Sequence, residues 1–208
     1  MKKKKILLII VWIIFALFLF APKSYADLDE IVNYNVTVDP RMTDGTLDIV
    51  YEITWRVLDS TKEGPLTWVQ IGTANENFDG LEALTDNIQR ISKYNGSYVR
   101  VDFKRSYYEG EEVTFKYKLH QSYMYKLSWS KCKYDFTPAW FTDSIIEKMT
   151  VRWNAEDVKS SNSKTKEDNY LVWTRNNMSK GQKLKIKVTY PKSSFTYLNS
   201  NRQRYRYY

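Results

Sequence analysis

The stretch that most clearly indicates the fold is Leu47-Asp48-Ile49-Val50-Tyr51-Glu52-Ile53-Thr54-Trp55-Arg56-Val57. Its odd-numbered positions are all apolar or aromatic, and most of its even-numbered positions are polar. Successive side chains of a pleated strand point to opposite faces, so this alternation gathers the apolar side chains on one face. We therefore predict a half-buried β-strand here.

The same two-residue period recurs along most of the chain. It is found in residues 32–38, 99–103, 113–119, 149–153 and 184–190. Turn-forming pairs such as Asp44-Gly45 and Asn95-Gly96 separate these runs, and only residues 81–91 leave room for a short helix. The pattern predicts an all-β fold, an antiparallel β-sandwich of the immunoglobulin-like or a related type.

The N-terminal residues read as an export signal. Four lysines precede an unbroken apolar run over residues 6–21, and Ser24-Tyr25-Ala26 offers small residues at the expected cleavage site. This order predicts a signal-peptide helix over residues 1–26, cleavage between Ala26 and Asp27, and a secreted or extracytoplasmic protein. The alternative is an uncleaved anchor, because the run is nearly long enough to span a bilayer.

Composition predicts one globular domain after the signal. No compositional break interrupts residues 27–190, so we expect a single β-sandwich there, with residues 159–168 as an exposed hairpin loop and 191–208 as a basic, aromatic tail. Without residues 1–26 the balance is 27 basic against 24 acidic side chains, and the formal charge falls from +8 to +3. Such a weak net charge argues against a nucleic-acid partner.

Several chemistries are excluded by what the sequence lacks. Cys132 is the only cysteine, so no intramolecular disulfide forms, and we expect a buried, inert thiol. His120 is the only histidine, which argues against a Ser-His-Asp triad and against most zinc sites. A Cys132–His120 dyad would need a third, orienting group that nothing marks. No glycine-rich phosphate loop occurs. We predict no catalytic residue, no metal and no cofactor.

Paired carboxylates are the remaining catalytic alternative. Asp135 with Asp143, or Glu109 with Glu111 and Glu112, could act as acid and base in a carbohydrate-active enzyme. Acidic side chains are abundant on any surface, so solvated carboxylates are the simpler interpretation. The discriminating observation is two acids that line one concave pocket beside aromatic rings.

Aromatic and basic residues are interleaved between Tyr123 and Phe141. Tyr134, Trp140 and Phe141 are the candidate binding residues, since rigid rings with a polar handle make good contact surfaces. The alternative is that these rings fill the sandwich core, which we expect for Trp129 and Phe136.

The C-terminus alternates arginine with other residues. Arg202, Arg204 and Arg206 would form a cationic stripe if extended, suited to anionic wall polymers or lipid headgroups. The alternative is a frayed, solvated end.

Residues 31–57 also carry a family resemblance. A strand with Tyr34-Asn35-Val36-Thr37-Val38, the Asp44-Gly45 turn and the strand quoted above together resemble the extracytoplasmic N-terminal domain of a bacterial predicted-membrane-protein family of unknown function. The resemblance extends over residues 27–190 and implies a β-sandwich after a signal peptide. Members typically continue into a transmembrane helix, and this chain has no second apolar run to match it.

These observations lead to one prediction of function and two alternatives. We expect an exported, non-enzymatic β-sandwich module that binds a cell-wall polymer or an envelope protein, and that touches the membrane transiently through its signal peptide. A carbohydrate-active enzyme and a membrane-tethered structural ectodomain are the alternatives.

Overall fold

The computed structural model describes residues 28–198, and strands dominate this part of the chain. The expected signal peptide with its Ala26–Asp27 cleavage site, and the arginines of the C-terminal tail, lie outside the described residues. A single short 3-10 turn, η1 (Lys192–Ser194), follows the last strand. The strands are β1 (Asp29–Pro40), β2 (Leu47–Val57), β3 (Leu66–Gly72), β4 (Phe78–Ala83), β5 (Ile88–Tyr94), β6 (Tyr98–Tyr107), β7 (Glu112–Gln121), β8 (Tyr125–Leu127), β9 (Lys131–Phe136), β10 (Ile146–Asn154), β11 (Ser160–Ser161), β12 (Thr165–Glu167), β13 (Tyr170–Met178) and β14 (Ile186–Pro191).

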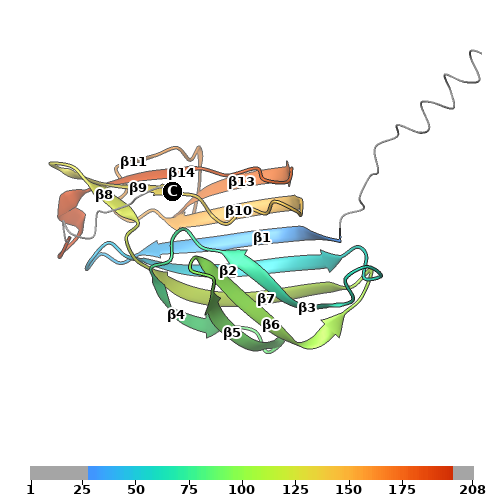
Figure 1. Ribbon diagram of the computed structural model, residues 1–208. Coiled ribbons are helices and arrows are strands. Elements are labelled where there is room, and N and C mark those ends of the chain that lie inside the picture. Colours follow the sequence, from blue (N-terminus) through green and yellow to red (C-terminus); the bar gives the residue numbers. More distant parts are fainter. Residues whose placement is uncertain (1–27, 199–208) are drawn as a thin grey trace, which may run out of the picture.

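Three sheets form two layers. A seven-stranded sheet has the order β12-β13-β10-β1-β2-β7-β4, a four-stranded sheet the order β11-β14-β9-β8, and a three-stranded sheet the order β3-β6-β5. Figure 1 shows the two smaller sheets over different halves of the large one. Ring contacts join the layers: Phe103 of β6 lies 5.2 Å from Phe115 of β7, and Tyr134 of β9 lies 5.2 Å from Trp153 of β10. The arrangement is compatible with a β-sandwich.

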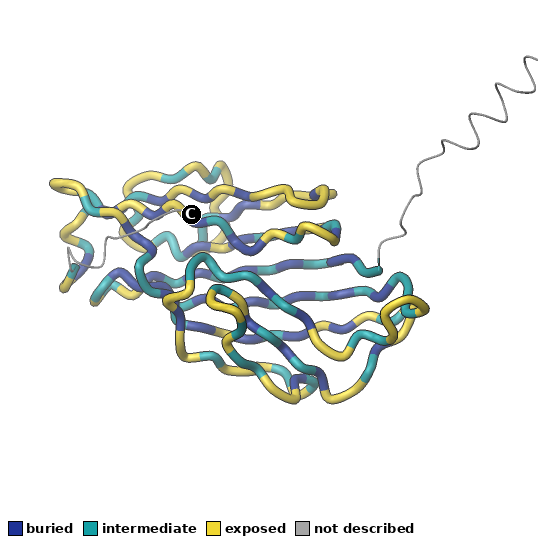
Figure 2. The backbone as a smooth tube through the Cα atoms, viewed as in Figure 1, coloured by how far each residue is buried: buried dark blue, intermediate teal, exposed yellow. Residues whose placement is uncertain are grey.

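The alternation of residues 47–57 is confirmed. Each odd-numbered residue of β2 is buried, and each even-numbered one is partly exposed on the open face of the large sheet. Figure 2 shows the same alternation of dark blue and teal along the central strands. β2 lies between β1 and β7 in the large sheet, with one face on the core and the other open.

One expectation about the sheets is wrong. β1 pairs antiparallel with β2 but parallel with β10, so the large sheet is mixed rather than purely antiparallel. The chain between β2 and β10 forms the whole three-stranded sheet and the strands β8 and β9 of the four-stranded sheet, so β10 enters beside β1 from a distant part of the sequence. Local alternation contains no information about strand direction, so it could not predict this pairing.

Two local expectations also need correction. Residues 81–91 contain no helix, because β4 ends at Ala83 and β5 begins at Ile88. Residues 159–168 are exposed but hold the short strands β11 and β12, which join the edges of two different sheets. Within the described residues no helix is long and apolar enough to cross a membrane.

Candidate functional site

The site is built by the loop between β9 and β10. This loop crosses from the four-stranded sheet to the large sheet and carries Trp140 and Phe141 in its middle. The Phe141 ring packs edge-on against Trp55 at 5.5 Å and against Tyr34 at 5.8 Å. These contacts fix the loop on the core, since edge-to-face rings at this separation attract each other.

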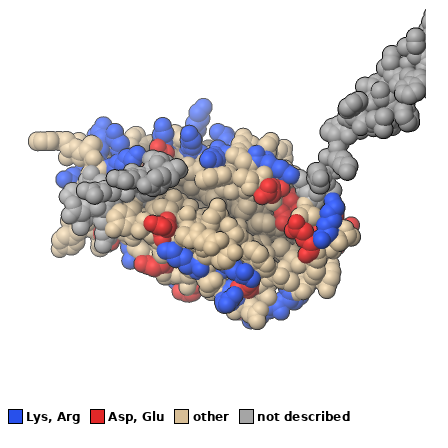
Figure 3. Space-filling model, viewed as in Figure 1, with Lys and Arg blue, Asp and Glu red and all other residues tan. Residues whose placement is uncertain are grey.

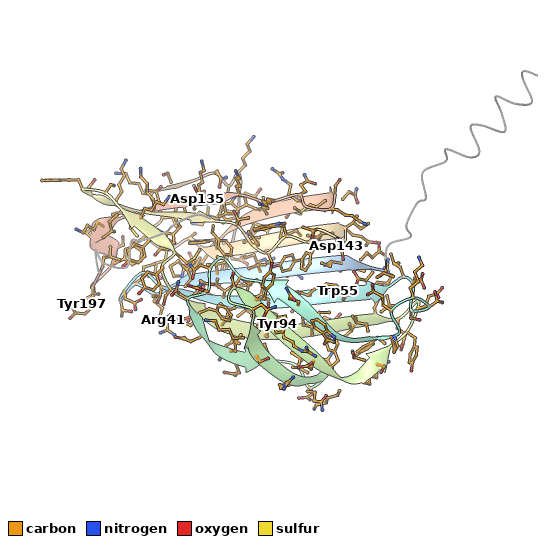
Figure 4. The ribbon with its side chains drawn as sticks, viewed as in Figure 1. Arg41, Trp55, Tyr94, Asp135, Asp143 and Tyr197 are labelled. Atoms are coloured by element: carbon orange, nitrogen blue, oxygen red, sulfur yellow. The ribbon has the colours of Figure 1, made fainter. Side chains whose placement is uncertain are left out.

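A cleft of about 450 Å³ lies between this loop and the three-stranded sheet. In Figure 4 the labelled Trp55 and Asp143 lie near the same end of the molecule. The lining of the cleft includes two large exposed rings, Trp140 with 41% and Tyr98 with 40% of its surface exposed. The lining residues are Asp29, Trp55, Gln70, Gly72, Thr73, Ser97, Tyr98, Ala139, Trp140, Phe141, Thr142, Asp143 and Ser144.

One wall of the cleft is the free edge of β3. β3 pairs only with β6, and the Thr73 amide donates to the Ser97 carbonyl at 2.7 Å. Thr73 and Ser97 therefore form a hydrogen-bonded pair. Because hydrogen-bonded and non-hydrogen-bonded pairs alternate along an antiparallel ladder, Gln70 and Gly72 belong to non-hydrogen-bonded pairs. Their amide and carbonyl groups therefore point away from β6, and both residues line the cleft. The edge offers backbone donors and acceptors to another extended chain.

The floor of the cleft contains a buried donor. Trp55 is 5% exposed, and its indole nitrogen has no hydrogen-bond partner among the described residues. A buried N–H without a partner destabilises a fold by about 1–3 kcal/mol. An acceptor that reached this nitrogen would remove that cost.

The lining is acidic. It contains the carboxylates of Asp29 and Asp143 and no lysine or arginine. The Ser144 hydroxyl donates to Asp29, and the Thr142 hydroxyl donates to Asp143 at 3.0 Å. Lys183 lies just outside, with its Nζ 3.8 Å from the centre of the Trp140 ring. The cleft therefore favours a cationic group over an anionic one.

The structure places the predicted binding residues in different environments. Trp140 and Phe141 line the cleft, but Phe141 is half-buried and serves as an anchor of the loop. Tyr134 is 2% exposed, and its hydroxyl donates to the Gly45 carbonyl at 2.8 Å, so its prediction as a binding residue is wrong. It shares the inward face of β9 with Phe136, whose burial is confirmed. Trp129, expected in the core, is 98% exposed.

The two residues considered for a nucleophilic dyad lie in different layers. Cys132 is buried in the four-stranded sheet, and burial raises the pKa of its thiol to about 12. His120 lies on β7, where its Nδ1 is 2.8 Å from a carboxylate oxygen of Asp48. Although burial opposes it, hydrogen bonds from Arg41 and His120 hold the pKa of Asp48 below its ordinary value.

The carboxylate pairs proposed from the sequence do not line this cleft together. Asp135 and Asp143 are well separated in Figure 4, and Asp143 alone lines the cleft. Glu111 accepts from Arg105 at 2.8 Å, and Glu112 pairs with Arg56 at 2.7 Å.

Sequence reasoning missed Asp29. The fold places Asp29 beside the loop between β9 and β10, which lies far from it along the chain. Sequence reasoning also missed the β3 edge, since the pattern of residues 66–72 shows no interruption that would mark an edge. Over residues 28–198 no group of three or more His, Cys, Asp and Glu side chains could hold a metal ion.

Comparison with known proteins finds likeness only among solved structures. No family model matches the chain, and no curated protein matches it. An M1 zinc metallopeptidase from Deinococcus radiodurans aligns with a TM-score of 0.48 and 10% identity, over 78% of this chain and 42% of that one. A mutant two-domain M1 zinc metallopeptidase bound to L-tryptophan aligns with a TM-score of 0.45 and 11% identity, over the same shares. This chain thus spans less than half the length of either.

These findings correct the predicted function. The expected non-enzymatic module finds no support in these comparisons, in which the solved neighbours are described as zinc metallopeptidases. Only part of the predicted aromatic surface is exposed, since Trp140 lines the cleft whereas Tyr134 is buried and Phe141 is packed on the core. At this level of likeness, neither the zinc site nor the reaction of those peptidases transfers to this chain.

Proposed function

We propose that the cleft beside β3 captures an extended polypeptide segment. The observation that carries the proposal is the free β3 edge, at which the backbone groups of Gln70 and Gly72 face the cleft. An extended peptide can add to such an edge through main-chain hydrogen bonds, while pockets beside the edge select its side chains.

The side chains around the edge support a peptide with a basic residue. Asp29 and Asp143 provide two carboxylates in a lining without cations, which suits a lysine, an arginine or a free N-terminal ammonium. The exposed ring of Tyr98 adds a surface on which the aliphatic part of such a side chain can pack.

Gly72 keeps the cleft open. A Cβ atom built on it would lie 3.6 Å from the Cβ of Ala139 and 3.8 Å from the Tyr98 ring, at ordinary contact distance. Atoms beyond that Cβ would occupy space between the two walls. Gly72→Val therefore fills the cleft with a residue that strands accept well.

The proposal includes a location and a fold type. We place the domain outside the cytoplasm on the strength of the export signal expected in residues 1–26. We assign it to the β-sandwiches, with one parallel pair in its large sheet, and keep the resemblance to the extracytoplasmic domain of a bacterial membrane-protein family as part of this proposal.

The test is binding to an array of short random peptides. We expect the retained peptides to share a lysine or arginine, and Gly72→Val to weaken their binding at least about tenfold, as a filled cleft requires. Ser92→Val is the matched control, because it adds a valine to β5, the opposite edge strand of the same sheet.

Unchanged thermal unfolding of both variants would show that the fold is intact. Retention of no peptide by the wild type, or equal binding by Gly72→Val, would rule out capture at this cleft.

A further inference from the structure

The hairpin of β8 and β9 ends in a fully exposed tryptophan. Trp129 lies in the turn between Leu127 and Lys131 and is 98% exposed, the highest value among the exposed large hydrophobic residues of the described chain. Figure 1 shows this hairpin projecting at the left end of the molecule, and Figure 2 shows its tip as exposed. We refer to residues 126–133 as the hairpin tip.

Two lysines face each other across this hairpin. Lys126 and Lys133 are directly opposite in the register, and both are exposed. Together with Lys131 they give residues 126–133 three lysines and no acidic side chain, and this positive charge attracts an anionic surface.

The inward face of the hairpin is firmly packed. Tyr125, Cys132 and Tyr134 are buried against the core, and the Ser128 amide donates to the Lys131 carbonyl at 2.8 Å. The tip is therefore a rigid support for its outward side chains. Figure 3 shows lysine and arginine side chains gathered along the upper edge and upper left of the molecule.

We propose that the hairpin tip docks on an anionic lipid bilayer, with the Trp129 indole at the headgroup level and the lysines of the tip on the headgroups. An indole prefers the interface between water and hydrocarbon, because one edge is polar and the ring is apolar. Each lysine held near an anionic membrane strengthens binding about fivefold.

A bilayer fits this surface better than a protein partner does. Lysine is depleted in protein interfaces, and the tip offers a single ring without a surrounding apolar patch. A bilayer requires neither shape complementarity nor a large contact area from a hairpin.

The readout must be local to the tip, because the apolar run of residues 6–21 could itself bring the full chain to a bilayer. We use the full chain with Trp12→Phe, which removes the tryptophan of that run, and vesicles that carry brominated acyl chains. The emission of Trp129 is obtained by subtracting the emission of the double variant Trp12→Phe/Trp129→Phe from the emission of the Trp12→Phe protein.

With phosphatidylglycerol in phosphatidylcholine vesicles, we expect the lipid bromines to quench the Trp129 emission. With phosphatidylcholine alone the quenching should be lost. Lys133→Glu should lower the ratio of docked to undocked tip at least about fivefold. Lys104→Glu, an exposed lysine on β6, is the matched control and should leave the quenching unchanged.

Two outcomes would overturn the proposal. One is Trp129 emission that bromine does not quench in phosphatidylglycerol vesicles. The other is equal quenching in neutral vesicles and in the Lys133→Glu variant, which would remove the role of charge. Peptide capture by the cleft is measured without vesicles, so either proposal can fail alone.

Discussion

The indole nitrogen of Trp153 donates a 2.7 Å hydrogen bond to the hydroxyl of Tyr190, which itself donates to the Asn154 carbonyl at 3.0 Å. Trp153 belongs to β10 of the large sheet and Tyr190 to β14 of the four-stranded sheet. Both side chains are fully buried. The two layers are therefore joined by a polar contact inside an aromatic core, where each group has a partner.

Removing that hydroxyl should destabilise the fold. Tyr190→Phe leaves the Trp153 N–H buried without its acceptor, and we expect a loss of about 1–3 kcal/mol in the free energy of unfolding. Denaturant unfolding measures it. Tyr197→Phe is the control, since Tyr197 is 75% exposed and its substitution should change little. Equal stability of the Tyr190→Phe protein would mean that this contact contributes nothing.

Gly45 should tolerate a side chain worse than Gly181 does. Both have positive φ angles, +73° and +72°, so alanine at either position is strained by about 1–2 kcal/mol. A Cβ on Gly45 would also lie 2.9 Å from the Tyr125 ring and from Leu198, whereas Gly181 faces open space. We expect Gly45→Ala to lower the unfolding midpoint further than Gly181→Ala. Matching midpoints would show that the neighbours of Gly45 yield freely.

Asp143 should contribute to peptide affinity through its charge. Asp143→Asn keeps the size of the side chain and removes one of the two carboxylates of the cleft. We expect a several-fold weaker affinity for lysine-containing peptides, and a smaller effect at high salt because exposed charges are screened. Isothermal titration calorimetry measures both. Asp135→Asn, outside the lining, is the control, and an equal loss there would remove the specific role of Asp143.

The Cys132 thiol should be unreactive in the folded protein. Burial raises its pKa to about 12, against about 8.5 for a free cysteine, so little thiolate forms near neutral pH. We expect iodoacetamide to label the protein only after unfolding, as mass spectrometry would show. Between these two pKa values the folded state keeps the thiol proton while the unfolded state loses it. The stability of the fold should therefore fall as the pH rises from about 8.5 to about 12. Cys132→Ala should weaken this alkaline loss, and fast labelling of the native protein would contradict the assigned burial.

The alternation of side chains was readable along the chain because it is a local property of a pleated strand. It correctly predicted the buried face of β2 and the burial of Phe136 on β9. It failed for Trp129, which lies in a turn where no strand phase defines an inward face. It also failed to exclude Tyr134 as a binding residue, although that residue shares the phase of the buried Phe136.

The two-residue period of this chain was enough to predict a β-rich fold. The neighbours of each strand were decided only in three dimensions, as the parallel pairing of β1 with β10 and the open edge of β3 demonstrate. Side-chain alternation depends on the geometry of adjacent peptide units, whereas strand partners depend on how whole sheets pack. The cleft exists because that packing brings Asp29 and Asp143, far apart in the sequence, to the same edge.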